Sequence, residues 1–173
     1  MNSTHPRQQG GFTVIETTVY VGLFSLLSII IMNTMWSTIR ISNELRVTRD
    51  INDTAVVVME RLTRDIKNAT LVDIANSSFA SSPGRLTIQT MTASGTAMTV
   101  EYFVASSTLR VKENGVDKGS LLSTRTQIEG LVFYYITSGA TVAIKTELHM
   151  RSLRGASTNV DHFYNTTILR GTY

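Results

Sequence analysis

The sequence predicts an α+β protein in which one long N-terminal helix packs on a mainly antiparallel β-sheet. Three observations lead to this prediction. An apolar run without a polar stripe follows residue 11, an amphipathic pattern with a step of roughly 3 to 4 residues comes next, and beyond Gly84 apolar residues alternate with a period of two. The chain of 173 residues has room for one such segment and one compact domain of about 100 to 150 residues.

Charge and cysteine content narrow the function classes. The formal net charge is +3, with 16 Lys and Arg against 13 Asp and Glu. The basic residues are scattered among the acidic ones, so they do not form the cluster that phosphate binding favours. The chain has no cysteine, which excludes disulfides, thiolate metal sites and a cysteine nucleophile.

Residues 12–36 (FTVIETTVYVGLFSLLSIIIMNTMW) form the first predicted element. At about 1.5 Å per residue, a helix of this length crosses a hydrocarbon layer of about 30 Å. Glu16 is its only charge, and no small-x-small cleavage site follows before Arg40. We therefore expect the segment to stay on the chain as a single membrane anchor. Arg7 favours a cytoplasmic N-terminus and an extracytoplasmic remainder, but Arg40, Arg46 and Arg49 weaken this charge argument.

The start of this segment carries a family resemblance. Gly11-Phe12-Thr13-Val14-Ile15-Glu16, followed at once by an apolar helix, resembles the prepilin motif of type IV pilins and type II secretion pseudopilins. The resemblance implies that a membrane-embedded prepilin peptidase cuts after Gly11, removes the leader 1–11 and methylates the new amine of Phe12. It also implies that Glu16, then the fifth mature residue, pairs with the N-terminal amine of a neighbouring subunit during filament assembly.

Glu16 has a physical reason to need a partner. An ionised carboxylate in hydrocarbon costs several kcal/mol unless it is paired, and ionisable residues in membrane spans are usually functional. A second interpretation is an interfacial glutamate that is protonated or reaches headgroup water. Thr13, Thr17, Thr18 and Gly22 either let helices pack closely in a filament core or are ordinary residues of a span.

The next predicted element, residues 37–69, continues the helix in amphipathic form. Apolar residues recur along it at Ile41, Leu45, Ile51, Ala55, Val58, Leu62 and Ile66. One helix from about Phe12 to Asn68 is the simplest interpretation. No proline interrupts it, which favours a straight helix and argues against a major pilin. Residues 59–67 resemble a segment of minor pilins and pseudopilins, and we interpret their charges as a solvated face that includes the pair Glu60 and Arg64.

A loop at 70–84, rich in Ser, Asn and Ala, precedes a β-sheet head at 85–173. Alternation predicts strands around Leu86, Val100 and Leu109, with a turn at Asn114-Gly115. Further strands are predicted at 127–137, 141–151 and 162–169, giving an antiparallel sheet of about five to seven strands with one face on the helix. Residues 162–170 resemble the closing strand of J-type minor pseudopilins.

The head shows no motif for chemistry. His5, His149 and His162 form no zinc motif, and we expect the two head histidines to be sheet-surface residues. No calcium loop, nucleophile elbow or phosphate loop is present, so we predict no enzyme, no catalytic residue, no metal and no cofactor. Arg151, Arg154 and Arg170 are either a basic patch for DNA or, in the simpler interpretation, a dispersed solvated face.

The expected function is therefore structural. The resemblance implies a minor pilin or pseudopilin of an extracytoplasmic type IV pilus-like filament, processed by prepilin peptidase. Its expected partners are other pilin or pseudopilin subunits through the N-terminal helix, and membrane lipid before assembly. The alternatives are a pseudopilin of a type II secretion system, a DNA-binding or adhesive minor pilin, and, outside the family, a membrane-anchored extracytoplasmic binding domain.

Overall fold

The computed structural model describes residues 13–92, 95–153 and 160–170. These residues form one helix and eight strands, in an α+β arrangement with the helix packed on antiparallel sheets. The chain divides into two compact units, Met1–Asn43 and Glu44–Tyr173. We call them the first unit and the head unit.

Helix α1 (Val14–Lys67) is unbroken over 54 residues. It ends within one residue of the expected position, Asn68, and Arg64 and Lys67 in its last turn suit the negative end of the helix dipole. Its buried residues are Ile51, Ala55, Val58, Leu62 and Ile66. The amphipathic stripe is thus confirmed from Ile51 onward, whereas Ile41 and Leu45, which continue the same pattern, are each 55% exposed.

The strands form two sheets rather than the single sheet that the sequence predicts. The five-stranded sheet has the order β1 (Ala69–Val72), β2 (Leu86–Met91), β3 (Ala97–Ala105), β4 (Thr108–Glu113), β5 (Val116–Ser120). The three-stranded sheet has the order β6 (Thr126–Ser138), β7 (Thr141–Ser152), β8 (Val160–Ile168). All pairings are antiparallel.

Strand β1 corrects the loop assigned to 70–84. Its four residues pair with β2, and only the ends of the strand, Ala69 and Val72, are buried. A strand this short shows no alternation along the sequence. Its extended conformation therefore depends on pairing with β2. The turn at Asn114-Gly115 is confirmed, because both residues have positive φ (51° and 80°) between β4 and β5, as a tight hairpin turn requires.

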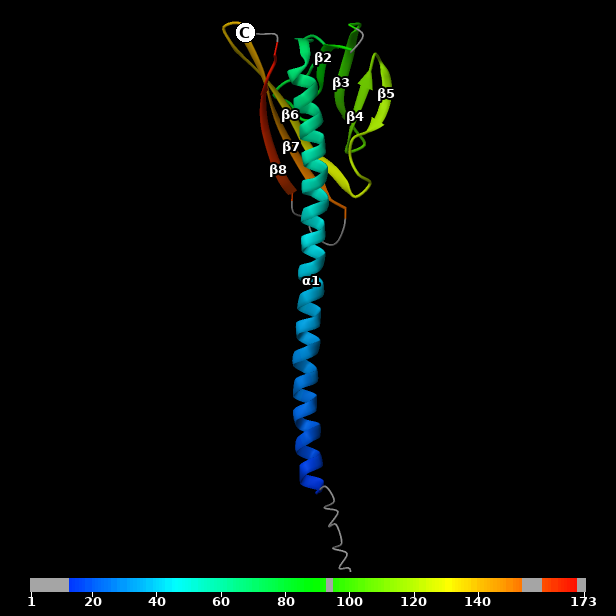
Figure 1. Cartoon of the computed structure of the whole chain (residues 1–173), viewed down its shortest axis with the longest axis vertical. Coiled ribbons are helices and arrows are strands. Elements are labelled where there is room, and N and C mark those ends of the chain that lie inside the picture. The colour runs from blue at the N-terminus through cyan, green and yellow to red at the C-terminus, as the bar shows by residue number, and fades with distance from the viewer. Residues whose placement is uncertain (1–12, 93–94, 154–159, 171–173) are drawn as a thin grey trace, which may run out of the picture. The chain divides into compact units, whose positions relative to one another are not determined.

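One core joins the helix to both sheets. The buried stripe of α1 forms one cluster with apolar residues of both sheets. The five-stranded sheet contributes Leu86, Ile88, Val100, Tyr102, Leu109 and Val111, and the three-stranded sheet contributes Leu131, Phe133, Ile144, Leu148 and Met150. Figure 1 shows the two sheets on either side of the helix within the head unit. Each fully buried side chain of this size contributes roughly 1.5 to 3 kcal/mol.

The segment before β2 joins the sheets at the edge of β6. The backbone N–H of Gly84 donates to the carbonyl of Leu131 at 2.7 Å, and that of Ala80 donates to the carbonyl of Phe133 at 2.8 Å. A Cβ on Gly84 would lie 3.0 Å from the Leu131 oxygen, so only glycine fits this approach without displacement. The edge of β6 is therefore covered by the segment that connects β1 and β2 of the five-stranded sheet.

Polar contacts fix α1 against strands of both sheets. The Tyr102 hydroxyl of β3 donates to Asp65, and Arg61 pairs with Glu113 of β4 at 3.1 Å. On the other side, Asn165 of β8 donates to the Thr63 hydroxyl at 2.6 Å. Burial, and next the bond to Asp65, raises the pKa of Tyr102 well above its ordinary value.

Candidate functional site

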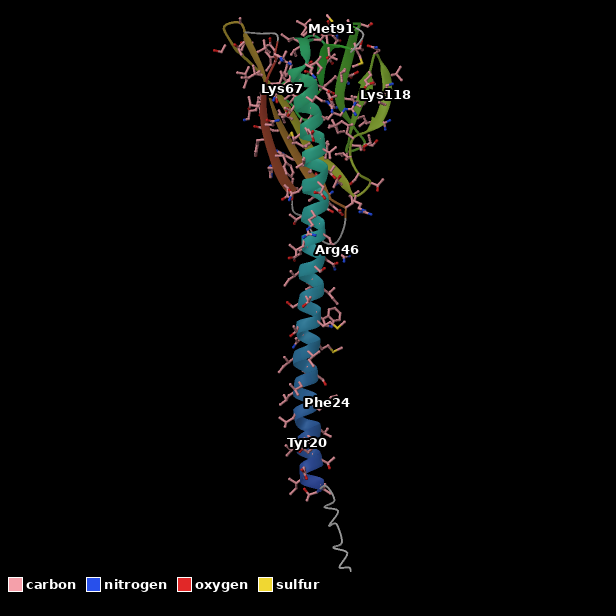
Figure 2. All side chains as sticks on the ribbon, viewed as in Figure 1. Tyr20, Phe24, Arg46, Lys67, Met91 and Lys118 are labelled. Carbon is pink, nitrogen blue, oxygen red and sulfur yellow. The ribbon has the colours of Figure 1, made fainter. Side chains whose placement is uncertain are left out.

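The first candidate region is the apolar part of α1 in the first unit. The helix is long and apolar enough to cross a membrane. Its side chains are exposed on every side, including Phe24 (72%) and Ile31 (65%). Tyr20 and Phe24 project outward from the ribbon (Figure 2), and both are exposed. An apolar surface of this extent on one helix is typical of a segment that lipid or other helices cover.

Hydroxyl groups in this part of the helix have partners on their own backbone. Six of them, those of Thr17, Thr18, Ser25, Ser28, Thr34 and Thr38, donate to the carbonyl four residues earlier. A hydroxyl bonded in this way enters an apolar medium without an unsatisfied donor. These threonines and serines are therefore compatible with lipid, and Glu16 differs from them in carrying an ionisable group.

The helix begins with a cap that involves the Glu16 backbone. The N–H of Glu16 donates to the Thr13 side-chain oxygen at 3.3 Å, and the N–H of Thr17 donates to the Thr13 carbonyl at 3.1 Å. Thr13 is thus the N-cap and Glu16 the third helical residue, the positions of Thr-x-x-Glu in a capping box. The signal that could have revealed this cap is Thr13-Val14-Ile15-Glu16 directly before an apolar run. An acidic side chain in the first turn also suits the positive end of the helix dipole.

The Glu16 carboxylate makes no ion pair with any residue that the structure describes. The next charged residue along α1 is Arg40, 24 positions later, or about 36 Å along a helix. A cation that pairs with Glu16 must therefore come from the preceding residues or from another molecule. Gly11 and Phe12, the candidate cleavage and methylation residues, lie outside the described residues.

The structure brings two of the candidate head residues together and separates two others. His149 on β7 and His162 on β8 are register partners, with ring centroids 4.2 Å apart. Arg151 pairs with Val160 at the start of β8, whereas Arg170 follows its end. The ten residue steps from Val160 to Arg170 span about 30 Å of extended chain. Arg151 and Arg170 therefore do not form one basic patch. Arg154 lies outside the described residues.

Charged side chains on the outer face of the three-stranded sheet occur in pairs. Lys145 and Glu147 of β7 are 2.7 Å apart, and Arg151 and Glu129 are 2.8 Å apart. The bond to Glu147 raises the pKa of Lys145, and the same bond lowers the pKa of Glu147. Across the described ranges, no group of three or more His, Cys, Asp or Glu side chains is placed to hold a metal ion.

No protein-family model, curated protein or solved structure matches this chain.

Proposed function

We propose that this protein is a structural subunit, a minor pilin or pseudopilin, of an extracytoplasmic filament that assembles from the membrane through α1. The observation that carries the proposal is Glu16. It is a single carboxylate at the start of a long apolar helix, directly after the Gly11-Phe12 junction at which a prepilin peptidase would cut.

Cleavage after Gly11 would supply the missing cation. It would leave a positive amine on Phe12, four residues before Glu16. Four residues correspond to about 6 Å along a helix. A second helix packed in parallel and displaced by about one turn would therefore bring its own amine level with Glu16. Since both charges are costly in hydrocarbon when apart, their pairing would favour this register over others.

The remainder of the chain supports a structural role. Helix α1 is unbroken from the apolar part to the stripe that packs on the sheets, so one element belongs to both units. In an assembled filament the apolar part would bury its exposed surface against neighbouring helices, while the head unit folds around its own core.

Glu16→Gln tests the charge pairing separately from the helix cap. Glutamine is also accepted at the third position of a capping box, so this variant keeps the cap and loses the charge. We expect Glu16→Gln to insert in the membrane and to be cleaved normally. Its incorporation into filaments, measured on sheared filaments from cells that express the assembly machinery, should fall by at least tenfold.

Thr13→Val is the matched control. It removes the capping hydroxyl that accepts from the Glu16 N–H, but retains the carboxylate. The pairing model predicts that this variant still assembles. Normal incorporation of Glu16→Gln, or equal loss in both variants, would contradict the proposal, because charge would then not be what recruits the subunit.

A further inference from the structure

Two histidines of the head unit lie side by side on the outer face of the three-stranded sheet. His149 of β7 and His162 of β8 are direct register partners, 13 residues apart in sequence. Their rings are 4.2 Å apart between centroids and inclined by 62°. Side chains directly opposite each other on antiparallel strands have Cβ atoms about 4.5 to 5.5 Å apart. The strand ladder therefore holds the two imidazoles close together.

One side of the pair lies against β6 and the other side faces the open edge of the sheet. On the far side of β7, the register partner of His149 is Gly130 of β6, and a Cβ there would lie 3.0 Å from the His149 Nδ1. The absence of a side chain at Gly130 lets the His149 ring lie against the strand. His162 is exposed on β8, which is an edge strand of its sheet. Solvent thus reaches the pair from the open edge.

We propose that His149 and His162 together bind one transition-metal cation of the zinc, copper or nickel class, each through one ring nitrogen. Imidazole suits these ions, whereas magnesium and calcium prefer oxygen ligands. A metal–nitrogen bond is about 2.0 to 2.1 Å, so two nitrogens on one ion lie at most about 4.2 Å apart. The ring centroids are already 4.2 Å apart, so rotation of the two side chains would bring one nitrogen of each to one ion. Water completes the coordination.

Nearby charges do not oppose a cation at this place. The same face of β7 carries Glu147 two residues before His149 and Arg151 two residues after it. Arg151 is neutralised by Glu129 at 2.8 Å. Lys145 is likewise paired with Glu147, at 2.7 Å, so neither of these cations stands unpaired beside the histidines.

Metal binding would connect β8 to the rest of its sheet through side chains. Within the described residues, β8 forms strand pairs with β7 alone. A ligand that binds the folded pair and not the unfolded chain stabilises the fold by an amount that grows with the logarithm of its free concentration above the dissociation constant. The ion would therefore act as a clip on the edge strand, in the part of the protein expected to be extracytoplasmic.

Zinc titration of the full chain in detergent micelles tests this proposal. The protein is untagged and carries His5→Gln throughout, so that His149 and His162 are its only histidines. We expect one Zn²⁺ per chain by isothermal titration calorimetry, and a thermal midpoint that rises with zinc and returns on chelation. His162→Gln should weaken binding by at least tenfold and abolish the rise, with no effect on the midpoint without metal. With Cu²⁺, electron paramagnetic resonance should show two nitrogen ligands, and one in His162→Gln.

Tyr164→Ala is the control on the same face of β8, because it removes an exposed side chain next to the pair and should leave zinc binding unchanged. The proposal is overturned if His149→Gln and His162→Gln each bind zinc as tightly as the parent, or if the parent binds zinc only at millimolar concentration.

Discussion

Tyr102 shows how one residue serves both packing and polar pairing. Its side chain is buried in the core, yet its hydroxyl reaches Asp65 on α1, next to Arg61. A buried donor without a partner is costly, and a bond to a charged acceptor is worth about 1.5 to 3 kcal/mol. Alternation predicted the strand around Val100, but the contact between Tyr102 and Asp65 joins residues 37 positions apart and could not be predicted from spacing along the chain.

Tyr102→Phe should change how stability depends on pH. Because the pKa of Tyr102 is raised in the folded protein, folding keeps a proton on this hydroxyl that the unfolded chain loses above pH about 10. The stabilisation is complete below that pH and falls as pH rises further. Replacing Tyr102 with phenylalanine should lower the free energy of unfolding by about 1 to 2 kcal/mol at pH 7. It should also make the loss of stability at alkaline pH less steep, by the slope that corresponds to at most one proton released on unfolding.

Urea unfolding of the full chain in micelles at pH 7 to 11, followed by near-ultraviolet circular dichroism, measures this difference. An equally steep decline in the parent and in Tyr102→Phe would show that the hydroxyl of Tyr102 ionises alike in both states, contrary to the structure.

The candidate site residues differ in how far the sequence could reveal them. Gly11, Phe12 and Glu16 stand in a contiguous motif, and motifs of this kind need no tertiary information. The Thr13 cap was also visible, as Thr-x-x-Glu before an apolar run. His149 and His162 were not, because their proximity depends on the register between β7 and β8 and not on spacing along the chain.

At the scale of elements, hydrophobic periodicity predicted the helix and the strands that bury one face against the core. The helical stripe from Ile51 and the strands β3, β4, β6, β7 and β8 follow the predicted pattern. In β2 the predicted Leu86 and Ile88 are buried, but so is Thr87 between them. Strand β1 was not predicted because a segment of four residues is too short to show a period. Strand β5 was not predicted either, because it is mostly exposed and its apolar residues do not alternate. The division into two sheets was missed because it depends on tertiary contacts near β6.

Val58→Ala and Val57→Ala test the packing face of α1 with neighbouring residues of the same type. Val58 is 0% exposed and Val57 is 61% exposed. Deleting buried methyl groups loses transfer energy and leaves a cavity, so Val58→Ala should cost about 1.5 to 3 kcal/mol. Val57→Ala should lie within about 0.5 kcal/mol of the parent. Similar losses in both variants, measured by urea unfolding, would contradict the assigned face.

At the scale of the whole molecule, the two units follow different physical rules. The head unit has its own core and two sheets, whereas the first unit exposes its apolar surface and lacks a core among its described residues. That surface requires lipid or other helices. A single chain with one self-sufficient unit and one that needs partners is what a membrane-assembled filament subunit requires, and the proposed function explains both parts.

The N-terminus of the mature protein tests the central claim most directly. The chain is coexpressed with an active or an inactive prepilin peptidase, purified from membranes, and analysed by intact-mass and N-terminal peptide mass spectrometry. With the active enzyme we expect loss of residues 1–11 and a methylated Phe12; with the inactive enzyme, or with Gly11→Leu, the leader should remain. A mature membrane protein that keeps Met1 in the presence of the active peptidase would contradict the account.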